Sequence, residues 1–207
     1  MKSSATYHNA DAEFSDVIVY LGSATGVAST GAFGDWPGVV ALDENADGYA
    51  DAAITYQATP TQTQVAVFNG SALGIHAPAS VTQSLLGNAA DIGTNLTTDV
   101  NGDGDADLLT VSHVDPLRNV DVWYLPGGAA GLGTPVDLSL TSAIIGLHIG
   151  TIGDINGDGF GDLLAAIETM PTRYLAQFNG TVSGPATASS ATLTWPNNMS
   201  TSIRPCS

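Results

Sequence analysis

The chain has 207 residues, of which 20 are acidic and only 4 basic, so its formal net charge is −16. This charge argues against nucleic acid as a partner, because binding a row of phosphates requires a basic surface. No apolar run reaches the length of about 18 residues that a membrane-spanning helix needs, which predicts no membrane insertion. The 43% hydrophobic content is enough for a folded core, and the single Cys206 cannot form an intrachain disulfide.

The first ten residues, MKSSATYHNA, contain no apolar stretch of the signal-peptide kind. Two alternatives follow: an intracellular protein, or one whose leader has been removed. We interpret residues 1–16 as a segment that precedes the folded units.

An internal repeat organises most of the chain. Three nine-residue segments share the pattern D-x-N-x-D-G-x-x-D and begin at Asp43, Asp99 and Asp154, which are 56 and 55 residues apart. An apolar run follows each segment, and a proline comes 17 residues after its first Asp (Pro60, Pro116 and Pro171). A second signature, VAVFNGSALG at 65–74, recurs at 122–131 and 175–184 and also opens the repeats at 17–26. The order is therefore half a repeat followed by three whole ones.

The repeats predict an all-β fold. Their apolar segments are short and rich in β-branched and aromatic residues, they are bounded by Gly, Pro, Asn and Asp, and none keeps a helical period. We expect four strands per repeat, which in the second repeat lie near 93–99, 107–112, 120–125 and 134–140. Four-stranded antiparallel units repeated at this length are typical of β-propeller blades. The expected units are a partial blade at 17–32, blades at 33–86, 87–142 and 143–196, and a tail or junction strand at 197–207.

The three acidic segments are candidate calcium loops. Hard oxygen donors at positions 1, 3, 5 and 9, with the backbone carbonyl of position 7, can surround a cation of calcium size, and Gly at position 6 permits the sharp turn. Magnesium fits less well, because it prefers to keep its waters. The expected side-chain ligands of the three Ca²⁺ sites are Asp43, Asn45, Asp47 and Asp51; Asp99, Asn101, Asp103 and Asp107; and Asp154, Asn156, Asp158 and Asp162. The expected carbonyl ligands belong to Tyr49, Asp105 and Phe160.

Other interpretations of these loops fit less well. An EF-hand needs a Glu at position 12, where this chain has Ile54, Thr110 and Ala165, and it also needs flanking helices. A dockerin fails for the same reason. A turn that binds nothing is a further alternative, since Asn, Asp and Gly favour turns. The recurrence of all four ligand positions in three loops favours a metal site.

These loops, Phe33-Gly34 before the first of them, the proline at the GAP-like position and the G-S-x-x-G turn resemble the FG-GAP repeats of integrin α-subunit propellers and their bacterial relatives. The resemblance covers about residues 17–195. Ile92-Gly93 and Ile149-Gly150 replace Phe-Gly in the later repeats, and Ala58-Thr-Pro60 is what is left of the GAP tripeptide. The resemblance implies a calcium-braced propeller in which each loop stiffens the hairpin between the first two strands of a blade. It also implies an extracellular or cell-surface location and a role in ligand binding or adhesion.

A closed ring of seven such repeats needs about 385 residues at this period, so a chain of 207 residues fills about half of a ring. One interpretation is a fragment of a longer propeller. The other is a homodimer with two-fold symmetry, in which residues 200–206 of one copy pair with 17–21 of its partner and close a ring of about eight blades.

We expect no enzymatic activity, because the four His residues have no metal-type spacing and no catalytic triad can be recognised. The ligand is expected to be a protein or a glycan. A propeller lectin is an alternative, with Trp36, Trp123 and Trp195 as a sugar platform, although packing between blades explains these residues better. A non-catalytic accessory module of a secreted protein is the third possibility.

Overall fold

The computed structural model describes most of the repeat region. The described residues are 16–23, 26–35, 38–59, 61–75, 79–86, 96–113, 120–138, 146–168 and 172–196. Several features expected above lie outside them: the segment before residue 16, the junction segment 197–207, Trp36, Ile92-Gly93 and the three repeat prolines.

The described residues form fourteen β-strands and no helix. The first two strands are β1 (Asp16–Ser23) and β2 (Gly26–Asp35). The next four are β3 (Gly38–Leu42), β4 (Asp51–Thr59), β5 (Gln62–Phe68) and β6 (Val81–Leu86). They are followed by β7 (Leu96–Thr98), β8 (Asp107–His113), β9 (Val120–Leu125) and β10 (Val136–Asp137). The last four are β11 (Gly146–Gly153), β12 (Asp162–Glu168), β13 (Thr172–Phe178) and β14 (Ala191–Pro196).

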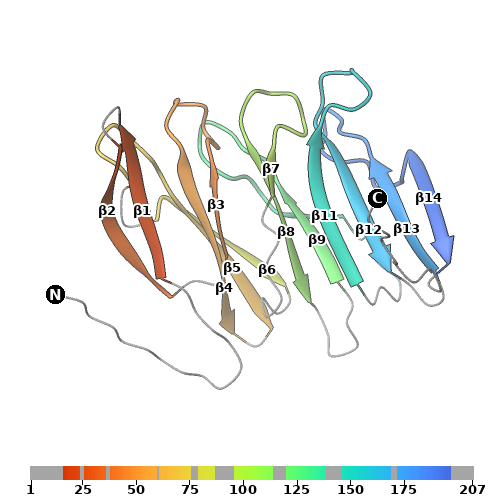
Figure 1. The fold of residues 1–207 in the computed structure, drawn as a ribbon, viewed down its shortest axis with the longest axis horizontal. Coiled ribbons are helices and arrows are strands. Elements are labelled where there is room, and N and C mark those ends of the chain that lie inside the picture. The colour runs from red at the N-terminus through yellow and green to blue at the C-terminus, as the bar shows by residue number, and fades with distance from the viewer. Residues whose placement is uncertain are drawn as a thin grey trace, which may run out of the picture.

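These strands form three four-stranded antiparallel sheets and one hairpin. In each sheet, strands that follow one another along the chain pair with one another: β3–β6 make the first sheet, β7–β10 the second and β11–β14 the third. The strands β1 and β2 form a separate antiparallel hairpin. The prediction of an all-β fold with four strands per repeat is therefore confirmed. Figure 1 shows the hairpin and the three sheets following one another across the molecule in chain order.

The second sheet is covered on both faces. Consecutive side chains of a strand point to opposite faces. Leu108, Trp123 and Leu125 pack in one cluster with first-sheet residues that include Val65 and Val67. Their strand neighbours, such as Leu109 and Tyr124, belong to a second cluster shared with the third sheet. A strand that is buried on both faces needs a continuous apolar run, as in Leu108-Leu109.

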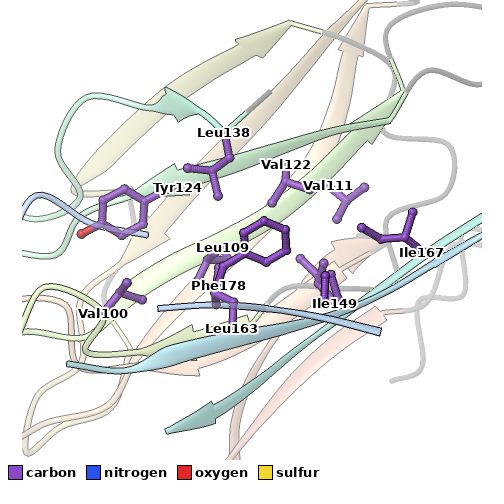
Figure 2. Close-up of a cluster of buried hydrophobic side chains, with 12 residues drawn as sticks. Val100, Leu109, Val111, Val122, Tyr124, Leu138, Ile149, Leu163, Ile167 and Phe178 are labelled. Carbon is purple, nitrogen blue, oxygen red and sulfur yellow. The ribbon is translucent and has the colours of Figure 1, made fainter. Parts of the chain in front are cut away.

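The interface between the second and third sheets is the larger of the two core clusters. Figure 2 shows Val111 and Val122 of the second sheet facing Ile149, Leu163 and Phe178 of the third. Val122 is fully buried and Leu163 is 2% exposed. Face-to-face packing holds successive sheets in one orientation, so the same edge of each sheet lies beside the same edge of the next.

Candidate metal-binding loops

The three acidic loops occupy the same place in the three sheets. Residues 43–51 connect β3 to β4, residues 99–107 connect β7 to β8, and residues 154–162 connect β11 to β12. Each loop thus joins the first two strands of its sheet, and its ninth residue is the first residue of the second strand. All fifteen residues proposed as ligands are among the described residues.

The first Asp of each loop holds the loop backbone through its carboxylate. In the first loop, the N–H of Asp47 donates to Asp43 Oδ1 at 3.1 Å and that of Gly48 donates to Oδ2 at 3.0 Å. Asp99 accepts the same two bonds and a third from Gly102. Asp154 repeats this pattern with Gly157, Asp158 and Gly159. Bonds from backbone N–H groups, chiefly that of Gly159, lower the pKa of the Asp154 carboxyl, which keeps it ionised at neutral pH.

Positions 3 and 5 continue the network one step further along the loop. In the second loop, Asn101 Oδ1 accepts the N–H of Asp103 at 3.0 Å, and Asp103 Oδ1 accepts the N–H of Asp105 at 2.9 Å. The corresponding bonds of the other two loops are 2.8–3.0 Å long. The expected oxygen donors therefore occur three times with the same local geometry. A carboxylate has about four acceptor positions, so these bonds leave capacity for a cation.

The backbone turns at positions 4 and 6. Position 6 is Gly in every loop, with φ of 86°, 94° and 91°, as the sequence predicts. Position 4 also has positive φ, which its residue types do not predict in all three loops: Gly102 and Gly157 have 74° and 79°, and Ala46 has 50°. An alanine in this region is strained by its Cβ, so the first loop folds at a small cost that the other two avoid.

The ninth-position Asp is buried and connects two parts of its sheet. Asp107 accepts the N–H of Val100 at 2.8 Å and that of Gly127 at 2.7 Å. Asp51 and Asp162 accept the equivalent pairs, from Glu44 and Gly70 and from Ile155 and Gly180. The residue ties the start of the loop to the glycine turn that follows the third strand. This structural role was missed from sequence, although that glycine follows the ninth Asp by 19, 20 and 18 residues in the three repeats.

The bond between the ninth Asp and the turn also explains why the turn has a glycine at this position in all three repeats. A Cβ built on Gly127 would lie 2.6 Å from the carbonyl oxygen of Ala106. Equivalent Cβ atoms on Gly70 and Gly180 would meet the carbonyl oxygens of Ala50 and Gly161. No side chain fits there, because the turn lies directly against the loop backbone.

Neighbouring loops are linked across the sheet interfaces. The N–H of Ala106 in the second loop donates to the Asp43 carbonyl at 3.0 Å. The N–H of Gly161 in the third loop likewise donates to the Asp99 carbonyl at 2.8 Å. The Phe160 ring lies against Gly102, where an added Cβ would be 3.0 Å from Cδ1. The three loops therefore form one hydrogen-bonded row along an edge of the stacked sheets.

Negative charge is concentrated in this row. Eleven of the 20 acidic residues lie in the three loops. Partial desolvation and the carboxylates of Asp103, Asp43 and Asp99 raise the pKa of Asp105, so charges from two loops act on one group. Burial raises the pKa of Asp107 against the lowering effect of its hydrogen bonds. A divalent cation would relieve this repulsion.

Among the described residues, no group of three or more His, Cys, Asp or Glu side chains converges closely enough to hold a metal ion. The carboxylates are turned toward N–H groups of their own loops. The type and positions of the oxygen donors fit a hard cation such as Ca²⁺, and the ninth-position Asp already has backbone partners on both oxygens.

Glu44, at position 2 of the first loop, is the least expected acidic residue. It is fully buried, and neither carboxylate oxygen has a hydrogen-bond partner of suitable geometry. Burial, and after it the neighbouring Asp51 carboxyl, raise the pKa of Glu44 to about 8. The equivalent residue of the second loop, Val100, is an apolar core residue, so Glu44 occupies an apolar position.

Trp123 does not form part of an exposed platform. It is 9% exposed, packs between the first and second sheets, and donates from Nε1 to Ser112 Oγ at 2.8 Å. The preferred interpretation of this residue as a packing element is confirmed.

The chain matches no protein-family model, and no curated protein matches it. Within the part of the chain that the structure describes, no helix is long and apolar enough to cross a membrane.

Proposed function

We propose that this protein is a calcium-binding β-propeller module of the FG-GAP type, which binds a protein or glycan ligand in an extracellular setting and catalyses no reaction. The observation that carries the proposal is the threefold repetition of one loop, alike in ligand pattern and hydrogen bonding, at the same edge of three stacked four-stranded sheets. The backbone bonds to the carboxylates at positions 1 and 5 use only part of their acceptor capacity, which favours a bound cation over a turn that binds nothing.

The propeller interpretation is supported by the way the sheets stack. Each four-stranded sheet falls within one of the proposed blade segments 33–86, 87–142 and 143–196. The β1–β2 hairpin covers residues 16–35, so it begins before the proposed partial blade 17–32 and ends within the segment proposed as the next blade. Blades of a propeller pack face to face around an axis, as the second sheet does against both of its neighbours. We propose that the ring is completed by a second copy, with the alternative that the chain belongs to a longer propeller.

In this proposal, the chain holds its ligand-binding surface rigid. The first, third and fifth residues of each loop direct oxygens around the turn, and the ninth Asp fixes the loop to the neighbouring strands. Bound Ca²⁺ supplies positive charge that offsets the repulsion among the carboxylates. Sites of the extracellular type have Kd values of about 10⁻⁴–10⁻³ M, so occupancy needs a calcium-rich environment.

The lectin alternative is weaker, because one of its three tryptophans is buried between sheets. A glycan array would separate a lectin from a module that binds proteins. The accessory-module alternative predicts that the isolated chain binds its parent protein and no free glycan.

Thermal unfolding with and without calcium tests the proposal. At a calcium concentration a hundred times Kd, each site adds about 2.7 kcal/mol to the free energy of unfolding. A chain of this size gains about 2–4 °C in Tm per kcal/mol. We therefore expect EDTA to lower Tm by about 5–11 °C for each site that it empties, calcium to restore Tm, and magnesium at equal ionic strength to restore much less. A Tm indifferent to EDTA would falsify the calcium assignment.

A further inference from the structure

Among the described residues, the second sheet covers one face of the third sheet and no sheet covers the other. Leu163, Ala165 and Ile167 of β12 point toward the second sheet. Residues between them in sequence belong to the opposite face, where Ala166 pairs with Leu175 and Leu175 with Leu193. We call this cross-strand row, together with Leu164, the outer face. Leu193 is 65% exposed there, whereas Ala166 and Leu175 are half-buried.

The corresponding rows of the other two sheets are buried by the next sheet. In the second sheet, Val111 pairs with Val122, whose carbonyl accepts the N–H of Leu138. These three side chains are 7%, 0% and 2% exposed beneath the third sheet. In the first sheet, Thr55 and Val65 are fully buried at the same positions. The position of Leu193 is taken there by Gln83, which is half-buried and donates to the Leu132 carbonyl of the next repeat at 3.0 Å. The outer face is therefore the equivalent of the two faces that, in the first and second sheets, are covered by the next sheet.

The loop edge shows the same difference. Position 2 of the loop is fully buried in the first and second loops, at Glu44 and Val100, because the following sheet lies over it. In the third loop this position is Ile155, which is 48% exposed. Both the sheet face and its loop are therefore shaped for a further sheet of the same kind.

The opposite end of the molecule carries the complementary element. The β1 sequence is apolar at five successive positions, Val17-Ile-Val-Tyr-Leu21, which is typical of a strand covered on both faces. Figure 1 places the β1–β2 hairpin at the end of the row next to the first sheet. On the first-sheet face turned away from the second sheet, Ile54 is 1% and Ala66 5% exposed. A hairpin has two sides, so one that lies next to this face has a second side that can pack on a partner.

We propose that the outer face of the third sheet binds the β1–β2 hairpin of a second copy of this chain, head to tail. This inference rests on the sheet-stacking part of the proposed function and not on calcium. The two ends of one molecule present different, complementary surfaces, so copies joined in this way form a closed ring if the rotation permits.

Light scattering over a concentration series, with calcium present, measures the association. The native chain should form an assembly of two or more copies. Leu193→Glu should raise the dissociation constant by about tenfold or more, because it places a charge at the centre of an apolar contact. Val182→Glu is the matched control, since Val182 is 78% exposed on a turn outside the outer face, and it should leave assembly unchanged. A native chain that stays monomeric throughout, or equal effects of the two variants, would overturn the proposal.

Cross-linking identifies the segment that binds the outer face. A photoreactive amino acid at position 193, used in a mixture of isotopically light and heavy chains, should yield mixed-isotope cross-links to residues 16–35. Cross-links to another region, or only within one chain, would contradict the inference. The calcium-dependent Tm shift of the native chain, measured beside its association, separates the two proposals. A preserved shift in a native chain that stays monomeric refutes the docking surface alone, whereas a missing shift in a native chain that assembles as expected refutes the calcium assignment alone.

Discussion

At the scale of single residues, Glu44 is the clearest departure from what its sequence context suggests. It stands in an acidic, turn-forming segment, where a solvated carboxylate is expected. The stacking of the second sheet over the first buries it completely. In the second and third sheets, a side chain donates a hydrogen bond to the ninth Asp: Tyr124 donates to Asp107, and Gln177 donates to Asp162. The residue equivalent to these two in the first sheet is Val67, which has no donor, and Glu44 lies next to Asp51 instead.

Glu44 should make the calcium-free protein less stable as the pH rises. Its pKa is about 8 in the folded chain and about 4.5 when exposed, so the folded state retains a proton that the unfolded state loses. The stabilising effect of the proton is complete below about pH 4.5 and is lost as pH rises toward 8. Glu44→Gln should remove this loss and stabilise the protein by about 1–3 kcal/mol at pH 8, with little difference near pH 4.5.

Urea unfolding of the native chain and of Glu44→Gln, both in EDTA across this pH range, measures the difference. The chelator removes the pH dependence that calcium binding would add. Parallel pH profiles of the two proteins would show that Glu44 titrates normally.

Some residue-scale features follow directly from the sequence. Gly at position 6 predicts the positive φ that the structure has, because that glycine is placed for a sharp turn. The burial of Glu44 could not be predicted in this way. It depends on which sheet packs over the loop, and that is a long-range contact with no local signal.

At the scale of the loop and its strands, the ninth Asp has a role that does not require a metal. Asp107 accepts two backbone N–H bonds and a bond from the Tyr124 hydroxyl at 3.1 Å, and it is fully buried. Asp103, a proposed ligand of the same loop, is exposed. The two carboxylates therefore differ in what they contribute before any cation binds.

Asp107→Ala should destabilise the calcium-free protein by about 2–4 kcal/mol, because it leaves buried donors without acceptors. Asp103→Ala should change the free energy of unfolding in EDTA by less than about 1 kcal/mol, as is usual for an exposed side chain. Both variants should lose part of the stabilisation by calcium. The measurement is urea unfolding in EDTA and again in calcium. Equal losses for the two variants in EDTA would contradict the structural role of Asp107.

The loop positions could be predicted because the pattern recurs in one register. The bond from the ninth Asp to the turn glycine was not predicted, although both residues recur. The loop and the turn are separated by two strands, and only the pairing of β8 with β9 brings Asp107 and Gly127 together. Loops are linked across sheets by backbone groups, which leave no trace in the residue types.

At the scale of the whole molecule, the repeat period predicts the number of strands per sheet but not how the sheets meet. The stacking follows from apolar residues on both faces of the second sheet, such as Leu108 and Leu109. The closure of a ring would add contacts between copies to the contacts that stack the three sheets within one chain. The row of three loops is the feature on which the functional account depends.

The most direct test of that account is a crystal structure of the protein soaked in calcium, with the ions located by anomalous scattering. We expect three peaks per chain, one in each loop, coordinated by the first, third and fifth side chains, the ninth Asp and the seventh carbonyl. The same map also shows how many copies form a ring. Loops without bound ions at millimolar calcium, with the carboxylates still bonded only to their own N–H groups, would contradict the account.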